Sequence, residues 1–280
     1  MIQDIYPSVL DNSYTPRPPK DGDVFLCFDG DGKIAADISA DGGIRSVQAQ
    51  DTSDAVYLFS VDSTGYFLSQ GDTDALPEGY GWYTVRELRD KCGGGKDLFA
   101  AFTAYHLWRW YADTRFCGRC GGKLCRHEKE RAMVCPSCGN VIYPRICPAV
   151  IVGVMNGDKL LITRYRRGYR HNALVAGFTG IGETLEQTVS REVYEETGIR
   201  VKNICYYKSQ PWGMAQDMLV GFFCEAETDE IHMDENELKY AEWVQREDIV
   251  PQPNDISLTN EMMKVFKAGD TTLLTKGGQI

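Results

Sequence analysis

The sequence lacks the segments that carry a protein into or across a membrane. It has no run of about 18 apolar residues, which is the length that a membrane-spanning helix needs. The first residues, Met1-Ile2-Gln3-Asp4, do not open a charged segment followed by an apolar one, as a secretory signal would. These absences predict a soluble, cytoplasmic protein.

An excess of positive charge is also missing. Thirty Lys and Arg face forty Asp and Glu, so the net charge is -10 and the isoelectric point is near 5.0. This balance argues against sequence-independent binding to long nucleic acid, which needs a basic surface. The sequence has no internal repeat or low-complexity segment. With 280 residues, 43% of them hydrophobic, the chain suffices for two domains with ordinary cores.

The cysteines form a metal-binding pattern. Two Cys-x-x-Cys pairs, Cys117 with Cys120 and Cys135 with Cys138, are separated by 14 residues and are each followed by glycine. Four thiolates around one tetrahedral Zn2+ explain this spacing, and such a site is structural because no ligand position stays open. The alternatives are a redox dithiol or disulfides. Cys125 lies between the pairs and fits neither, and the other five cysteines have no motif spacing.

Residues 184–198 carry the pattern of an amphipathic helix. Thr184 and Gln187 form a capping-box start, and Gly198 is suited to a left-handed stop. The pattern predicts a helix of about 13 residues with Val189 and Val193 on its buried side.

Three carboxylates, those of Glu192, Glu195 and Glu196, fall on one face of this helix. Like charges at such spacings repel by roughly 0.2–0.5 kcal/mol per pair on an isolated helix. A divalent cation would relieve the repulsion, and Mg2+ binds through one or two carboxylates together with substrate phosphates. The alternative is a solvated acidic face on which Arg191 pairs with Glu195.

The chain divides into three predicted parts. Residues 1–94 alternate short apolar runs with turn signals and predict a mostly β domain. Residues 95–145 hold a predicted helix at 96–113 and the four-cysteine ribbon. Residues 146–280 begin with two apolar runs joined through Asn156-Gly157-Asp158. This is a hairpin signal, because Asn156 and Gly157 both tolerate the positive φ of the two turn positions. The part closes with a helix near 257–267.

The acidic helix and its flanks resemble a known family motif. Residues 177–199 match every specified position of the Nudix box, namely Gly177, Glu183, Arg191-Glu192-Val193, Glu195-Glu196 and Gly198-Ile199. The resemblance implies an α/β/α sandwich, so that the expected fold class is α+β, with the zinc ribbon and the β domain preceding it. It also implies a box that binds Mg2+ or Mn2+ while water attacks phosphorus in a substituted nucleoside diphosphate.

Two further features narrow the resemblance. A zinc ribbon upstream of the box and Ser209-Gln210-Pro211-Trp212 downstream of it are similar to the NADH pyrophosphatases. This family implies hydrolysis of NADH or NAD to reduced or oxidised nicotinamide mononucleotide and AMP. It also implies removal of NAD caps from RNA 5' ends, and a homodimer.

The same resemblance implies roles for individual residues. Glu192, Glu196, Glu237 and the carbonyl of Ala176 correspond to the ligands of the catalytic metal, and Glu195 is a further acidic group of the reaction. Either Glu195 or Glu196 would orient or deprotonate the attacking water, and Arg191 would hold the carboxylates. For Phe178 and Tyr143 the alternative is core packing. The implied substrate contacts are Glu130, Tyr143, Phe178, Gln210, Pro211, Trp212, Asp217 and Ser257.

The sequence departs from the family pattern after Trp212. Gly213-Met214-Ala215-Gln216-Asp217 stands where the family has Pro-Phe-Pro-x-Ser, so that Asp217 brings a negative charge to the place of a small hydroxyl. Thr179-Gly180 and Ser257 are smaller departures. A second hypothesis is therefore hydrolysis of another nucleoside diphosphate, such as ADP-ribose. A third is a non-catalytic nucleotide sensor, which would be expected to lose a box glutamate, and this chain has kept them all.

Overall fold

The computed structural model describes the chain except for residues 41, 47–53, 70–75, 168–170 and 270–280. The chain forms two compact units. The sandwich unit comprises residues 147–211 and 217–280 together with Met1. The N-terminal unit comprises residues 2–146 and 212–216.

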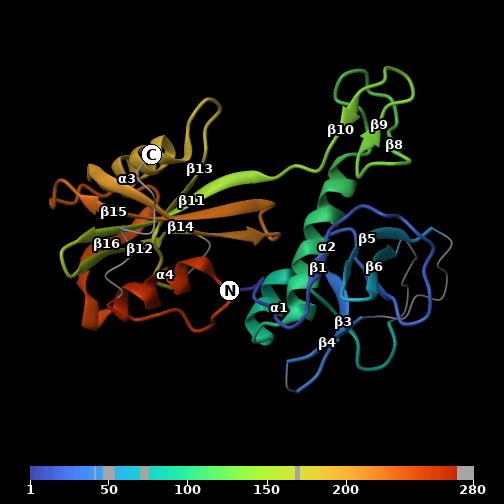
Figure 1. Cartoon of the computed structure of the whole chain (residues 1–280), viewed down its shortest axis with the longest axis horizontal. Coiled ribbons are helices and arrows are strands. Elements are labelled where there is room, and N and C mark those ends of the chain that lie inside the picture. The colour runs from blue at the N-terminus through green and yellow to red at the C-terminus, as the bar shows by residue number, and fades with distance from the viewer. Residues whose placement is uncertain (41, 47–53, 70–75, 168–170, 270–280) are drawn as a thin grey trace. The chain divides into compact units, whose positions relative to one another are not determined.

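The sandwich unit is built on one sheet with the strand order β14-β15-β11-β12-β16, and β13 pairs with β11 (Figure 1). β11 runs parallel to β15 and antiparallel to β12 and β13. The strands are β11 (Cys147–Asn156), β12 (Lys159–Tyr165), β13 (Val175–Phe178), β14 (Val201–Trp212), β15 (Asp217–Ala226) and β16 (Leu238–Gln245).

Two helices cover the two faces of this sheet, α3 (Leu185–Thr197) and α4 (Leu258–Lys267), and a 3-10 turn, η1 (Arg246–Asp248), follows β16. Successive side chains of a strand point to opposite faces. Val150 and Val152 accordingly pack in a core with residues of α3, whereas Ile151 packs in a second core with residues of α4. The predicted α/β/α sandwich is confirmed.

The hairpin between β11 and β12 is also confirmed, with a different turn from the expected one. Asn156 still pairs with Lys159, so the two connecting residues are Gly157 and Asp158 rather than Asn156 and Gly157. Only Gly157 of the two has a positive φ, 58°. The turn therefore needs one left-handed residue, and glycine supplies it without a steric cost.

The first part of the N-terminal unit is mostly β, as the sequence predicts. One sheet has the order β1-β5-β6-β2 and another the order β4-β3-β7. The elements are β1 (Leu10–Asp11), β2 (Val24–Cys27), β3 (Ile34–Ile38), β4 (Ile44–Ser46), β5 (Val56–Val61), β6 (Thr64–Ser69), β7 (Gly81–Tyr83) and α1 (Val85–Lys91).

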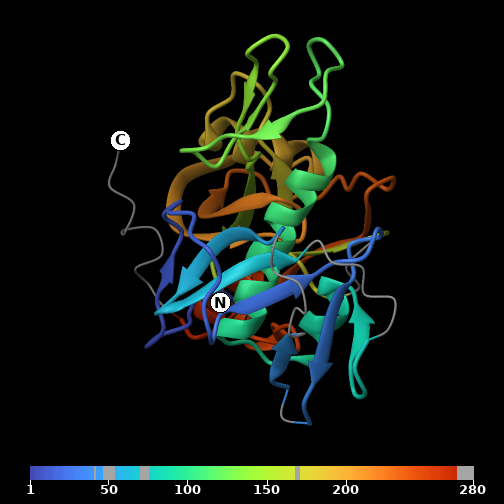
Figure 2. The same ribbon diagram turned by 90° about the vertical axis from the view of Figure 1, so that its right-hand side faces the viewer.

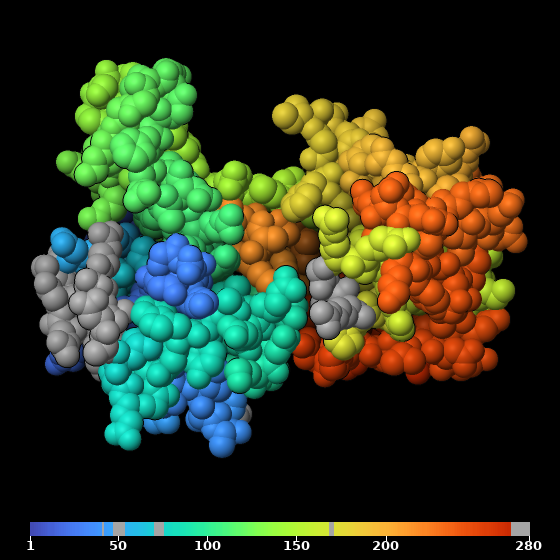
Figure 3. All heavy atoms as spheres, turned by 180° about the vertical axis from the view of Figure 1, so that it is seen from behind, coloured from blue at the N-terminus to red at the C-terminus, as the bar shows by residue number. Residues whose placement is uncertain are grey.

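The long helix α2 (Lys96–Asp113) confirms the helix predicted over 96–113 and lies along β5 and β6 (Figure 2). Its Trp108 stacks on Phe28 with ring centroids 5.3 Å apart. The residues after α2, coloured green in Figure 3, form a lobe with three short strands, β8 (Cys125–Arg126), β9 (Met133–Val134) and β10 (Val141–Ile142). None of the helices in the described part of the chain is long and apolar enough to span a membrane.

Candidate active site

Helix α3 presents the acidic face of the candidate site. It runs for 13 residues, begins with the predicted capping box between Thr184 and Gln187, and ends at Gly198, whose φ is 71°. Val189 and Val193 are fully buried in the core shared with the sheet. Because these valines fix the rotation of the helix, Glu192 is turned toward β13 and Glu196 toward the end of β12.

Arg191 binds three of the glutamates. Its guanidinium lies 2.5 Å from Oε1 of Glu183, 2.8 Å from Oε1 of Glu192 and 2.9 Å from Oε2 of Glu195, and it also donates to the carbonyl of Phe178 at 3.0 Å. This contact with Arg191, with the amide of Gly180, lowers the pKa of Glu183 to about 2. The pairing of Arg191 with Glu195 that the alternative interpretation contains is present, and Arg191 also ties the loop to the helix through Glu183.

Glu196 has no positively charged partner among the residues that the structure describes. It is 2% exposed, and burial, with Glu192 and Glu237 nearby, raises its pKa to about 8. Within the described ranges, its side-chain oxygens accept hydrogen bonds from Tyr165 and form no ion pair with Lys, Arg or His. A buried carboxylate is costly unless it is paired or binds a metal. This environment fits a divalent cation.

Glu192 lies close against strand β13. A Cβ atom at position 177 would overlap its carboxylate, so glycine is required there. Burial raises the pKa of Glu192, and the negative charges of Glu195 and Glu237 raise it further. The carboxylates of Glu192, Glu196 and Glu237 and the carbonyl of Ala176 are hard oxygen ligands, which suit Mg2+ or Mn2+. Among the described residues, however, only the four ribbon cysteines have ligand atoms all within 4.8 Å of one another.

Tyr165 is the site residue that the sequence analysis missed. Its hydroxyl lies 3.1 and 3.2 Å from the two oxygens of Glu196. Burial and the charge of Glu196 raise the pKa of Tyr165 well above its ordinary value, so the hydroxyl keeps its proton. The period of two along β12 is the signal that could have found it. Leu161 faces the α3 core, and Tyr165, four residues later, lies on the same face.

Gln210 and Ser257 have structural contacts in the sandwich unit. Gln210 is fully buried, and its amide donates to the carbonyl of Ile256 at 2.8 Å and accepts from the amide of Leu258 at 2.7 Å. Ser257 is the N-cap of α4 and donates to Gln252 at 2.6 Å. Pro211 follows Gln210 within β14 and is half-buried.

Phe178 and Asp217 differ in exposure. Phe178, at the end of β13, is 55% exposed, so the alternative of core packing is not its environment. Asp217, at the start of β15, is 6% exposed, and its Oδ1 has no hydrogen-bond partner among the described residues. Burial raises the pKa of Asp217 to about 6.

Three of the predicted substrate contacts belong to the N-terminal unit. The hydroxyl of Tyr143 donates to Glu130 at 2.9 Å, and both side chains are exposed. Trp212 packs edge-on against Phe102 of α2 with ring centroids 5.3 Å apart.

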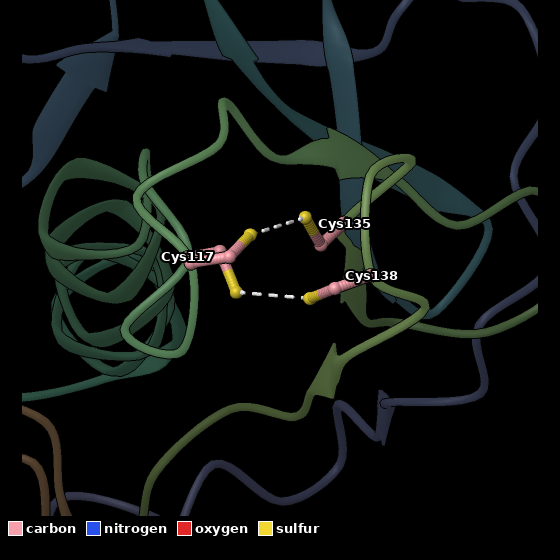
Figure 4. Close-up of side chains that lie close together, drawn as sticks. Cys117, Cys135 and Cys138 are labelled. Atoms are coloured by element: carbon pink, nitrogen blue, oxygen red, sulfur yellow. Dashed lines mark hydrogen bonds between the residues drawn. The ribbon is translucent and has the colours of Figure 1, made fainter.

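The four motif cysteines converge at one point of the ribbon. The sulfurs of Cys117 and Cys138 are 3.6 Å apart and those of Cys120 and Cys135 are 3.5 Å apart. Figure 4 shows the side chains of Cys117, Cys135 and Cys138 pointing toward a common centre. Sulfurs at the corners of a tetrahedron with Zn–S bonds of about 2.3 Å would be about 3.8 Å apart, so the cluster fits a zinc ion.

The backbone folds the two cysteine pairs in the same way. The amide of Cys117 donates to the carbonyl of Gly122 at 2.8 Å, and that of Cys135 donates to Asn140 at 2.9 Å. The amide of Arg119 donates to the sulfur of Cys117, and this contact lowers the pKa of that thiol to about 6. A low pKa favours the thiolate, which is the form that binds metal. Cys125 is exposed and lies outside the cluster.

Comparison with known proteins assigns the two motifs to one family. Residues 145–266 match the NUDIX domain and residues 112–143 match the NADH pyrophosphatase zinc ribbon domain. A protein named NAD-capped RNA hydrolase NudC from Citrobacter koseri is 40% identical over 179 residues, which cover 62% of this chain and 68% of that protein. The chain belongs to the Nudix hydrolases that carry this zinc ribbon.

Other relatives match about half of this chain. The NudC protein of Haemophilus influenzae is 42% identical over 142 residues, or 49% of this chain, and the chain spans about half, 54%, of its length. A Nudix hydrolase structure from Nitrosomonas europaea covers 56% of this chain and 92% of its own, with a TM-score of 0.50 and 21% identity. It supports the Nudix fold, and the resemblance read from the box and the ribbon is confirmed.

The buried charge of Asp217 gives the Nudix domain a testable pH dependence. Its folded-state pKa lies above the ordinary value of 3.8, so the folded protein binds this proton more tightly than the unfolded chain does. Ionisation of Asp217 therefore costs stability, increasingly from pH 4 to pH 6 and constantly above pH 6. Asp217→Asn should raise the free energy of unfolding at pH 7 by roughly 2–3 kcal/mol and change it little near pH 4.

Urea unfolding of the parent and the variant at pH 4, 6 and 8 measures this difference, and loss of zinc in acid affects both proteins equally. The matched control is Asp248→Asn, an exposed carboxylate of the same unit, for which we expect a change within about 0.5 kcal/mol at every pH. An equal effect of Asp217→Asn at pH 4 and pH 8 would contradict the account of its buried charge.

Proposed function

We propose that the protein hydrolyses the diphosphate bond of NADH or NAD to reduced or oxidised nicotinamide mononucleotide and AMP. The observation that carries the reaction class is the buried Glu196 carboxylate, which forms no ion pair with any residue that the structure describes and shares its surroundings with Glu192 and Glu237. The substrate class rests on the relatives named NAD-capped RNA hydrolase. Removal of NAD caps from RNA is proposed as a second activity of the same site.

The catalytic metal is proposed to be Mg2+ or Mn2+, held by Glu192, Glu196, Glu237 and the carbonyl of Ala176. When bound, such ions neutralise phosphate charge and make water a better nucleophile. The charge of Glu192 raises the pKa of Glu196, and the charge of Glu237 raises the pKa of both, so the three carboxylates lie in one region of negative charge. The zinc ion of the ribbon has a structural role in this proposal.

The side chains of the box carry out the remaining steps. A water molecule attacks one phosphorus, the bridging P–O bond breaks, and the leaving phosphate oxygen keeps the electron pair. Glu195 or Glu196 orients the water or accepts its proton, and Arg191 holds Oε2 of Glu195 at 2.9 Å. Arg191 contacts carboxylates and the loop, so its role is to fix their geometry.

Recognition of the dinucleotide is proposed to involve Phe178 and Asp217 in the sandwich unit. The exposed ring of Phe178 is available to stack on a base. The unpartnered oxygen of Asp217 can accept a hydrogen bond from an amide or an amino group. We also propose a role in substrate binding for six further residues. These are Glu130, Tyr143, Pro211 and Trp212, together with Gln210 and Ser257, which also have structural contacts.

A panel of substrates tests the proposed function. The zinc-loaded full chain is incubated with Mn2+ and equal concentrations of NADH, NAD, ADP-ribose and NAD-capped RNA, and the products are separated by chromatography. We expect AMP and nicotinamide mononucleotide from NADH or NAD, and 5'-monophosphate RNA from the capped RNA. Cleavage of ADP-ribose alone would favour the second function, for which the charge of Asp217 is the supporting observation. Release of nothing, with nucleotide still bound, would favour a sensor.

We also propose a localisation, an oligomeric state and domain boundaries for the protein. The protein is a cytoplasmic homodimer, with a β domain at 1–94, a helix and zinc ribbon at 95–145 and a Nudix domain at 146–280. Light scattering coupled to size-exclusion chromatography tests the dimer, because the expected mass is twice the 31.4 kDa of one chain.

A further inference from the structure

Tyr165 ends strand β12 with its hydroxyl inside the candidate metal site. The oxygen lies 3.1 and 3.2 Å from the two carboxylate oxygens of Glu196. It also lies 3.0 Å from the amide nitrogen of Ala176 and 3.4 Å from the carbonyl oxygen of that residue. One hydroxyl therefore joins three segments, β12, β13 and α3, and it contacts two of the residues that are proposed to supply metal ligands, Glu196 of α3 and Ala176 of β13.

The directions of these hydrogen bonds follow from the chemistry of the groups. The amide of Ala176 can only donate, so it occupies an acceptor site of the phenol oxygen. The single proton of the hydroxyl is then left for the oxygens of Glu196 and, more distantly, for the carbonyl of Ala176. Since the hydroxyl of Tyr165 donates a hydrogen bond to the carboxylate and keeps its proton, Glu196 is held by a donor that adds no charge to the site.

Tyr165 differs from Arg191 because its hydroxyl is an uncharged hydrogen-bond donor. Arg191 neutralises Glu183, Glu192 and Glu195, and such pairing competes with a cation for the carboxylates. Glu196 is kept out of that ion-pair network and is oriented by a phenol instead. The negative charge of Glu196 stays available for an incoming ion, while the hydrogen bond from Tyr165 restricts the rotation of the carboxylate. Groups that orient metal ligands in this way typically change metal affinity 10- to 100-fold when they are removed.

We propose that Tyr165 is a positioning residue that holds the carboxylate of Glu196 and the carbonyl of Ala176 in place for a divalent cation. The inference rests on the proposed metal site and deepens it, but it does not depend on which substrate the enzyme cleaves. The competing interpretation is that Tyr165 contributes only the packing of its ring.

Binding of Mn2+ alone, without nucleotide, distinguishes the two. In Tyr165→Phe the ring stays and the hydroxyl is lost, so we expect the dissociation constant for Mn2+ at this site, measured by electron paramagnetic resonance, to rise at least tenfold. With excess Mn2+ and NADH, kcat should recover to within about threefold of the parent, because the cation is then bound again. The zinc content should not change.

The matched control is Tyr207→Phe. Tyr207 is a half-buried tyrosine of the same unit whose hydroxyl contacts Glu261 at 3.2 Å. Its loss should leave Mn2+ affinity within twofold of the parent. A pairing test uses Glu196→Gln as the background, in which adding Tyr165→Phe should change Mn2+ affinity by less than about twofold, because the two residues act through one contact.

An unchanged Mn2+ affinity in folded Tyr165→Phe, within twofold of the parent, would overturn the proposal. If that variant does not fold, the structure of the unaltered chain with Mn2+ decides, since a Tyr165 hydroxyl more than about 3.5 Å from both Glu196 oxygens would equally overturn it. The proposed function can fail separately. One such result is that Tyr165→Phe loses Mn2+ affinity as expected while the parent cleaves none of the dinucleotides. That result would contradict the substrate assignment and still support this inference.

Discussion

Glu196→Gln is expected to lower turnover of NADH by roughly 10²- to 10⁴-fold while the protein stays folded. The amide keeps the shape of the side chain but removes the negative charge that would hold the cation. Glu196 is 2% exposed and has a pKa raised to about 8, so its charge is a cost to the metal-free fold. Removing that cost should leave the melting temperature of the metal-free protein unchanged or higher.

The matched control for this variant is Glu186→Gln. Glu186 lies in the first turn of the same helix and is exposed, so its variant should keep activity within twofold of the parent. Steady-state assays with Mn2+ and thermal melts of both variants measure the difference. If Glu196→Gln kept more than a tenth of the parent kcat, the role given to Glu196 would be wrong.

Cys117→Ser is expected to abolish zinc binding and to unfold the ribbon. Structural zinc contributes about 10–16 kcal/mol in zinc-finger peptides, far more than three short strands can supply without it. The ribbon core consists of Cys117, Cys135, Leu124 and Met133 packed on Trp110, so little apolar area would remain to hold it together. Zinc measured by mass spectrometry should fall from one ion per chain to nearly none. Proteases should then cut within residues 115–142.

Cys125→Ser is the control in the same ribbon. Cys125 is exposed and outside the sulfur cluster, so this variant should keep one zinc ion and resist proteolysis like the parent. A full zinc content in Cys117→Ser, or a loss of zinc in Cys125→Ser, would show that the four-cysteine assignment is mistaken.

Local sequence signals predicted the parts of the site that depend on neighbours in the chain. The capping box at Thr184, the stop at Gly198 and the buried Val189 and Val193 all act within one helix, and the structure has that helix with the same ends. The two cysteine pairs similarly form two short turns, each closed by its own backbone hydrogen bonds. Such features follow from short-range geometry, which a sequence displays directly.

Contacts between distant segments were not predictable in this way. Tyr165 meets Glu196 across 31 residues, and only the assembled sheet and helix bring them together. Gln210 belongs to a motif that resembles a substrate-binding element, yet its amide is bonded to the backbone at residues 256 and 258. Trp212 packs on Phe102 of a helix more than 100 residues earlier. In each case the partner is set by the fold, and the motif alone does not name it.

The most direct test of the central claim is a crystal structure of the chain soaked in Mn2+, with data collected at the manganese absorption edge. We predict an anomalous peak within about 2 Å of oxygens of Glu192, Glu196 and Glu237 and of the Ala176 carbonyl, apart from the zinc peak among the four cysteines. A map with the zinc peak present, no manganese near α3, and the three carboxylates directed away from one another would contradict it.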